Sequence, residues 1–403
     1  MAALAAGAAT LVLRPRGGLI DPAAVDPTAY FSAAELERAA DFRDLQRILS
    51  LAGTALAGVT VALIALRPPR RVRRALERTN RRPLLGAAAV AAGIAVTVTV
   101  VELPLSFWRH ERAVDAGLST QSLGPWLADV GKATAISALG AAIVGLLAMA
   151  LIRRFPRNWW APGAVFVVAA ATVMLYLQPI LIAPLFNDFE RLPDGPLRAE
   201  VLRLAERADV DVGEVYRVDA SRRTSAINAY VGGLGHTKRV VLYDNLIDDY
   251  PRGQVDSVVA HELGHVKHSD VPRGLLWIAI VAPAATFLIQ RLAQRFAGGA
   301  LDGREQPGPS ALPAVVLAFS LVAFAVGCAG NVLSRDVEAR ADAFALELTD
   351  DPKSFIALER SLATRNLGDP DPPALFQTLF GTHPTTIERI GYGVTFEGNA
   401  TGP

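Results

Sequence analysis

Two histidines four residues apart, with a glutamate directly after the first, form the chemically most informative part of this sequence. They lie in the run His261-Glu262-Leu263-Gly264-His265. If this run is helical, both imidazole rings lie on one face and can bind the same metal ion. Glu262 then lies beside the open coordination position, where a carboxylate can act as a general base. This spacing indicates a zinc-dependent hydrolytic site of the kind that metalloproteases use.

The residues around this run favour a helix. Apolar side chains recur at roughly helical spacing from residue 255 to residue 266, Pro251 and Gly253 suit a helix entry, and residues 252–271 contain no proline. The alternative is a helix whose histidines and glutamate are paired on its surface without a metal. The chain contains only six histidines, so two of them at this spacing around a glutamate favour the metal site.

The sequence after the second histidine excludes one class of zinc peptidase. A metzincin has a glycine three residues after that histidine and a third histidine six residues after it. This chain has His268 and Val271 at those positions. The third protein ligand must therefore come from elsewhere.

The next suitable acidic cluster lies in residues 334–345. On a helix, Glu338 and Asp342 share a face, so Glu338 is the expected third zinc ligand. Asp342 is expected to accept a hydrogen bond from a ligand histidine ring. The alternative is a solvated helix in which Glu338 simply pairs with Arg335 and Arg340. The incomplete zinc motif upstream favours the ligand interpretation.

The composition indicates a membrane protein. Hydrophobic residues make up 51% of the chain and charged residues only 20%. Most of the uncharged apolar stretches are long enough to cross about 30 Å of hydrocarbon. They are residues 48–66, 84–101, 133–152, 161–186, 274–289 and 311–333. The fifth reaches full length only if residues 290–292 are included, with Arg291 extending to the interface.

A seventh apolar stretch, residues 1–13, is too short to cross a bilayer. It is expected to be either the remainder of a longer helix or a signal-like segment, although it lacks a basic beginning.

Polar segments separate the apolar stretches and define the expected fold: a predominantly α polytopic membrane protein with a small α+β zinc-peptidase domain inserted between spans. Strand-like runs occur at residues 210–218, 228–231 and 240–243, before the zinc helix. Residues 104–132 form a further polar segment that is too short for a domain. The expected divisions are N-terminal membrane helices (1–186), a zinc-peptidase core (187–272), two spans (273–333) and a C-terminal segment (334–403).

Cysteine content and net charge exclude other functions. The single cysteine, Cys328, lies inside an apolar stretch, so neither a disulfide framework nor a cysteine zinc site is expected. The formal net charge of +1 argues against a nucleic-acid partner.

With these elements in place, the chain resembles the integral-membrane zinc peptidases typified by the type I CAAX prenyl proteases. The resemblance runs through most of residues 30–390. Besides the two metal motifs, further elements occur in the order found in that family. They are Pro184-Leu185-Phe186-Asn187, Asn228-Ala229-Tyr230, Lys238-Arg239-Val240-Val241-Leu242-Tyr243-Asp244, His383-Pro384 and Glu388-Arg389.

The resemblance implies a role for each matching residue. It implies that His261, His265 and Glu338 bind one zinc ion while Glu262 deprotonates the attacking water. The edge formed by Asn228, Ala229 and Tyr230 would bind the substrate backbone by strand addition.

Two residues near the C-terminus receive a role from the resemblance alone. His383 and Arg389 would donate hydrogen bonds to the oxyanion of the transition state. By spacing alone they would be a loop histidine and a surface arginine. His383 also requires the C-terminal segment to fold back over the zinc helix, which two intervening spans allow.

Departures from the family limit what the resemblance implies about substrates. Prenyl proteases tend to have a tryptophan directly after the second zinc histidine and a further histidine downstream, where this chain has Val266 and Asp270. Four lysines against thirty-six arginines suggest a bacterium with GC-rich DNA, in which prenylated substrates are not expected. The predicted function is therefore a membrane zinc endopeptidase that cuts membrane-associated or unfolded proteins.

A catalytically inactive scaffold or a transporter is the alternative. Transporters usually place ionisable residues inside their spans, whereas these spans contain none, and Glu102 at a span end is the nearest case. No expected zinc-site residue is missing, which disfavours an inactive scaffold.

The orientation in the membrane is predicted differently by two arguments. The loop at residues 67–83 has eight arginines and one acid, and residues 153–158 have three arginines. The expected location is a bacterial plasma membrane, where the positive-inside rule places these loops in the cytoplasm and the zinc domain on the outer side. The family resemblance favours a cytoplasmic zinc domain instead.

Overall fold

Long apolar helices make up most of the structure, a computed structural model that describes residues 1–233, 238–303 and 306–400. In these residues six helical segments are long and apolar enough to cross a membrane, as predicted. They are Ala33–Leu66 (α3), Pro83–Asp115 (α5), Leu123–Arg154 (α6), Trp160–Leu185 (α7, Trp160–Leu177, with two short turns), Asp270–Phe296 (α11) and Pro309–Thr349 (η5, Pro309–Ala311, with α12, Leu312–Thr349).

Several of these helices continue well beyond the apolar stretches. The polar segment at residues 104–132 is mostly helix, because α5 runs to Asp115 and α6 already begins at Leu123. The helix α12 continues without a break from its apolar half through Glu338, so the expected division after residue 333 falls inside it. Helical hydrogen bonds form between neighbouring turns and need no hydrocarbon around them, so a helix can extend from lipid into water.

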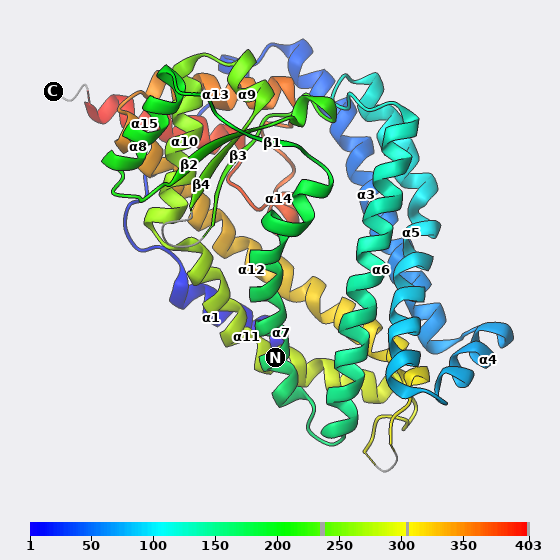
Figure 1. Ribbon diagram of the computed structural model, residues 1–403. Coiled ribbons are helices and arrows are strands. Elements are labelled where there is room, and N and C mark those ends of the chain that lie inside the picture. Colours follow the sequence, from blue (N-terminus) through cyan, green and yellow to red (C-terminus); the bar gives the residue numbers. More distant parts are fainter. Residues whose placement is uncertain (234–237, 304–305, 401–403) are drawn as a thin grey trace.

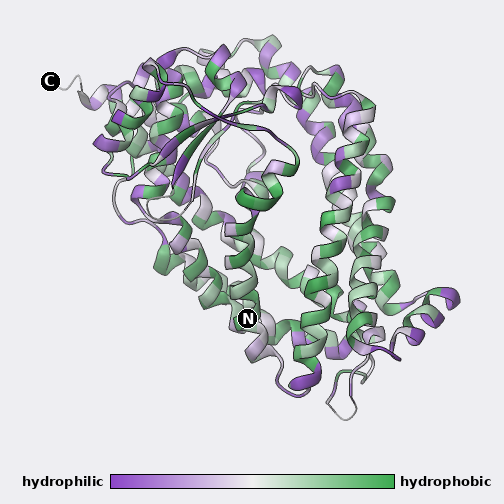
Figure 2. Ribbon diagram, viewed as in Figure 1, coloured by the Kyte–Doolittle hydropathy of each residue, from purple (hydrophilic) through white to green (hydrophobic). Residues whose placement is uncertain are grey.

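In Figure 1, α3, α5 and α6 lie side by side and α7 and α11 lie opposite them, while α12 crosses between the two groups and contacts α11 as well as α3 and α5. The short apolar helix Ala2–Leu13 (α1) packs against α11 and α12. Green apolar residues dominate these helices in Figure 2, whereas purple polar residues gather around the sheet at their upper end. The long helices therefore carry a polar layer at one end.

That layer contains a four-stranded sheet in the order β1-β2-β4-β3. Its strands are Phe189–Arg191 (β1), Glu214–Val218 (β2), Ala229–Gly232 (β3) and Arg239–Tyr243 (β4). The pair β2–β4 is parallel, while β1–β2 and β3–β4 are antiparallel. The three predicted strands are confirmed with shifted ends. The short strand β1 was not predicted, because its three residues include two exposed charged side chains.

Helices surround the sheet and complete its core. Pro196–Arg207 (α8), Arg252–Lys267 (α10) and Pro352–Arg365 (α13) contribute fully buried apolar side chains. The remaining helices of this layer are Pro27–Tyr30 (α2), Asp244–Asp249 (α9), Ala374–Phe380 (α14) and Thr386–Ala400 (α15). Burial of one apolar face gives most of the stability of such a layer.

The helix α10 carries the two predicted zinc histidines. Val255, Val259 and Leu263, spaced four residues apart, are buried against the core and fix its rotation. The helix ends at Lys267, four residues earlier than its proline-free sequence allows, because Ser269 has a left-handed backbone with φ of 55°. Beyond it, α11 starts in a new direction at Asp270.

A glycine brings α10 close to α12. A Cβ atom at Gly264 would lie 3.4 Å from the Cα of Ala341 and 3.1 Å from the ring of Phe344. A larger residue would push the two helices apart. The close approach places the histidine face of α10 opposite Glu338 and Asp342 on α12.

Candidate metal centre

His261, His265 and Glu338 converge on one point from two helices. The Nε2 atoms of the two histidines lie 3.1 Å apart. The Oε2 atom of Glu338 lies 3.1 Å from Nε2 of His261 and 3.6 Å from Nε2 of His265. All three side chains are mostly buried. The structure thus brings together the three side chains that the sequence suggested as metal ligands.

Two carboxylates hold the outer nitrogens of the histidine rings. Nδ1 of His261 lies 2.8 Å from Oδ1 of Asp342, and Nδ1 of His265 lies 3.0 Å from Oδ2 of Asp270. With Nδ1–H donating to a carboxylate, each Nε2 presents its lone pair toward Glu338. Asp342 therefore occupies the position expected for it.

The electrostatics of the cluster favour a positive charge between these groups. Burial alone would lower the pKa of His261, but hydrogen bonds to Asp342 and Glu338 raise it to about 10. Burial also disfavours the charged form of His265, but hydrogen bonds to Asp270 and Glu338 outweigh this effect and raise its pKa to about 9. The surrounding carboxylates stabilise a cation at this place, whether it is a proton or a metal ion.

A divalent metal ion fits this set of donors. Tetrahedral zinc with bonds of about 2.1 Å places neighbouring ligand atoms about 3.4 Å apart. The three separations here, from 3.1 to 3.6 Å, match that spacing. Two imidazole nitrogens and one carboxylate oxygen also leave one position open for water or substrate.

Glu262 and His383 lie beside the cluster. Burial raises the pKa of the Glu262 carboxyl group, and the charges of His261 and His265 reduce this rise without cancelling it. His383 reaches the centre from the C-terminal segment, with its Nε2 atom 3.3 Å from Oε2 of Glu338. Its side chain is 55% exposed, so it lies on the open side of the centre. The C-terminal segment therefore folds back over α10, as expected.

Arg389 occupies a different place from the one expected for an oxyanion donor. Its Nε and Nη2 atoms donate to Asp342 at 2.8 and 2.6 Å, and its Nη1 atom lies 2.9 Å from Oε2 of Glu359. Burial disfavours the charged guanidinium, but the two carboxylates outweigh this effect and raise its pKa. All three donor nitrogens of Arg389 thus contact carboxylates behind His261.

Glu359 and Asp270 are site residues that sequence reasoning missed. Glu359 is 2% exposed, and its Oε1 atom has no hydrogen-bond partner among the described residues. Burial raises the pKa of Glu359 to about 7 although Arg389 opposes this. Asp270, which also pairs with Arg340, begins the helix after α10. No helical spacing in the sequence links either carboxylate to the histidines.

The predicted substrate-binding residues lie at a sheet edge beside the centre. The edge strand β3 begins with Ala229 and Tyr230 and contacts α10, and Asn228 precedes it with an exposed side chain. Ala229 pairs with Leu242 of β4 and is only 3% exposed. One side of β3 thus pairs with β4 while the other is the edge of the sheet.

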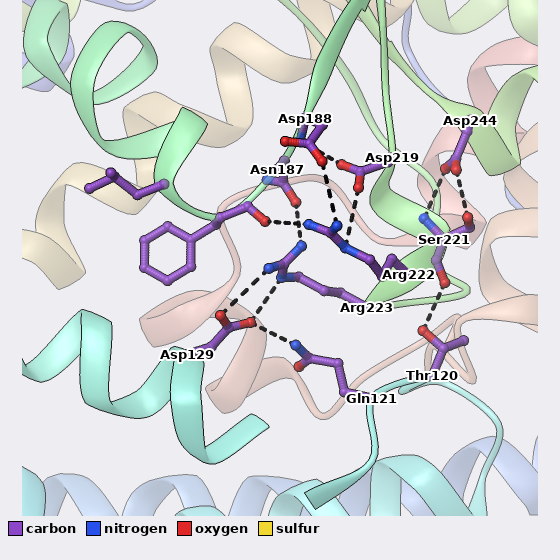
Figure 3. A network of polar contacts seen from close by, with 12 residues as sticks. Thr120, Gln121, Asp129, Asn187, Asp188, Asp219, Ser221, Arg222, Arg223 and Asp244 are labelled. Atoms are coloured by element: carbon purple, nitrogen blue, oxygen red, sulfur yellow. Dashed lines mark hydrogen bonds and ion pairs between the residues drawn. The ribbon is translucent and has the colours of Figure 1, made fainter. Parts of the chain in front are cut away.

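A polar network fixes the loop that leads into β3 (Figure 3). Arg223 binds Asp129 of α6 at 2.9 Å and Asn187 at 3.2 Å. The hydroxyl of Thr120, between α5 and α6, donates to the carbonyl of Ser221 at 2.8 Å. The strand β3 is therefore held in position relative to the α5–α6 pair.

Comparisons with known proteins agree with this geometry. A model of peptidase family M48 matches residues 191–392, and a model described as "CAAX prenyl protease N-terminal, five membrane helices" matches residues 28–188. The metalloprotease YhfN of Bacillus subtilis is 29% identical over 371 residues, which cover 91% of this chain and 87% of that protein. CAAX prenyl protease 1 of Saccharomyces cerevisiae is 27% identical, with coverage of 72% and 68%.

The crystal structure of S. mikatae Ste24p has a similar fold. It superimposes with a TM-score of 0.74 at 20% sequence identity and covers 97% of this chain and 98% of the other. The arrangement of membrane helices with a small α+β layer is therefore shared over nearly the whole chain.

Proposed function

Because this chain belongs to peptidase family M48 and is a membrane zinc metalloprotease, we propose that His261, His265 and Glu338 bind one zinc ion per chain. The observation that carries this proposal is the convergence of their donor atoms within 4.8 Å. When bound, zinc acts as a Lewis acid that lowers the pKa of water and polarises a peptide carbonyl.

The side chains around the metal ligands then transfer protons and stabilise the charge that develops during the reaction. Glu262 accepts a proton from the attacking water and passes it to the leaving amine. His383, on the exposed side of the centre, donates a hydrogen bond to the carbonyl oxygen as negative charge develops there. Asp342 and Asp270 hold the two ligand rings in the productive tautomer.

Arg389 acts through Asp342 in this proposal. Its two hydrogen bonds fix the carboxylate that orients His261, and Glu359 holds the guanidinium from the other side. Arg389 is thus a positioning residue, which replaces the oxyanion role that the family resemblance implied.

The substrate is a peptide or protein segment in extended form. Its backbone adds to the free side of β3 next to α10, and Asn228, Ala229 and Tyr230 line this edge. Membrane-associated or unfolded proteins of a bacterium are the proposed substrates, because an extended segment is needed for strand addition. The arginine-rich loops favour a zinc domain outside the cytoplasm.

A proteolysis assay tests this function. Purified protein is incubated with unfolded, membrane-anchored and lipidated peptides, before and after removal of metal by a chelator and readdition of zinc. We expect cleavage of the first two classes, loss of cleavage with chelator and recovery with zinc. Cleavage restricted to the lipidated peptides would contradict the proposed substrate class, and cleavage that resists chelation would contradict the metal mechanism.

His383→Ala is expected to lower kcat by about 10²-fold, because an oxyanion donor contributes on the order of 2 to 4 kcal/mol to the transition state. Zinc content and thermal stability should stay unchanged, since His383 lies on the exposed side. His383→Gln keeps a donor and should recover part of the rate. Wild-type kcat in the alanine variant would make His383 an ordinary loop residue.

Arg389→Lys is expected to lower both zinc affinity and hydrolysis by about 10- to 100-fold, as for other groups that orient metal ligands. Lysine keeps the positive charge but cannot form two parallel bonds to Asp342. Alanine is avoided because it would leave two buried carboxylates unpaired.

Glu359→Gln is the matched variant, since the amide oxygen of glutamine still accepts a hydrogen bond from Arg389. It should change zinc affinity and hydrolysis less than Arg389→Lys does. A loss of kcat in Arg389→Lys at unchanged zinc affinity would instead support a direct oxyanion role.

A further inference from the structure

The end of the molecule opposite the sheet carries a cationic helix whose arginine side chains have no partner among the described residues. This helix, Arg70–Thr79 (α4), joins α3 to α5 and lies at the lower right in Figure 1. Together with its flanking residues it contains eight arginines and one glutamate. The arginines are Arg67, Arg70, Arg71, Arg73, Arg74, Arg78, Arg81 and Arg82. We call this set the arginine face.

One side of α4 is fixed to the membrane helices. Leu76 packs against a buried cluster that includes Val61 and Ala87, and α4 contacts α5 and η5. After the helix, the side-chain amide of Asn80 donates to Oγ of Ser310 and accepts from its backbone N–H, both at 3.1 Å. The helix is therefore held in one orientation.

The opposite side of α4 presents the arginines to the surroundings. With 100° of rotation per residue, the five arginines within the helix fall on an arc of about 160°, and Val72 and Leu76 lie on the other side. All eight side chains are exposed. None forms an ion pair or side-chain hydrogen bond with any residue in the described ranges. Such a concentration of like charge repels itself unless an external anion neutralises it.

The position of α4 identifies the anion. The spanning helix α3 ends at Leu66 and α5 begins at Pro83, so the arginine face lies at the level where spans leave the hydrocarbon. Exposed leucines flank it, with Leu66, Leu84 and Leu85 being 49%, 42% and 61% exposed. Lipid chains can cover these leucines while lipid phosphates contact the arginines, whereas a nucleic acid would leave the leucines in water.

We propose that the arginine face is a docking surface for the headgroups of anionic phospholipids, in the leaflet opposite the zinc-peptidase layer. Each guanidinium can form two hydrogen bonds to a phosphate, and each arginine near an anionic surface strengthens binding by about fivefold. The surface would anchor and orient the α3–α5 end of the helix bundle.

Lipid binding to the full-length protein in neutral detergent tests the proposal by native mass spectrometry. The probes are phosphatidylglycerol, phosphatidylcholine with the same chains, inorganic phosphate and a single-stranded RNA oligonucleotide. The test variant changes Arg70, Arg71, Arg74 and Arg78 to glutamine. The matched control changes four exposed arginines near the other end, Arg16, Arg38, Arg109 and Arg252, to glutamine.

The wild type and the control should bind phosphatidylglycerol at least about tenfold more tightly than phosphatidylcholine, with a preference that weakens as salt is added. The test variant should lose this preference while its melting temperature and zinc content stay unchanged. An equal preference in the test variant, no preference in the wild type, tight binding of inorganic phosphate alone, or binding of RNA in place of lipid would each overturn the proposal.

Discussion

Replacing Glu262 with glutamine is expected to lower peptide hydrolysis by at least about 10²-fold while the protein keeps its zinc. Glutamine preserves the shape of the side chain, but its neutral amide cannot accept a proton from the attacking water. Glu262 is not among the three converging donors, so the metal should remain bound. The measurement is kcat on a peptide that the wild type cleaves, together with the zinc content of the same preparation.

Glu206→Gln is the matched control for this variant. Glu206 lies exposed on α8, and the same change there should leave the rate unaltered. A Glu262→Gln enzyme with near wild-type activity would show that another group acts as the base. Loss of zinc together with activity would show that Glu262 supports the metal and would leave its role as a base unsupported.

Replacing His265 with alanine is expected to reduce zinc from about one ion per chain to nearly none and to abolish hydrolysis. The variant removes one of the three protein donors, so only His261 and Glu338 remain to bind the metal. It also removes the hydrogen-bond partner of Asp270, the carboxylate that pairs with Arg340. Metal analysis after dialysis against a weak chelator measures the loss directly.

His268→Ala provides the control from the same stretch of chain. His268 follows α10 by one residue and packs its ring against Phe344, 5.5 Å between centroids. Zinc content should be normal in that variant. Glu338→Ala should behave like His265→Ala, and full zinc in Glu338→Ala would mean that a different group is the third ligand.

Local patterns in the sequence were sufficient for the parts of the fold that depend on neighbouring residues. The six spans are runs of apolar residues, most of which match the hydrocarbon thickness by their length alone, and all six are confirmed. His261 and His265 share a face because a helix repeats every 3.6 residues. The same rule places Glu338 and Asp342 on one side of α12.

Contacts between distant segments were out of reach of such patterns. The ends of α5, α6 and α12 lie well outside their apolar stretches, since packing at the polar layer extends these helices. Strand β1 has only three residues and exists through its pairing with β2. Its sequence contains no alternation long enough to predict a strand.

The inner arrangement of the metal centre shows the same division. The sequence by itself determined the histidine face of α10, the carboxylate face of α12 and the membrane spans, because each depends on spacing within one helix. The tertiary structure alone decided that Asp270 orients His265, that Arg389 binds Asp342 and Glu359, and that His383 reaches Glu338. These contacts join segments that are far apart in the sequence, and their geometry depends on how closely the helices pack, as at Gly264, and not on any repeat along the chain.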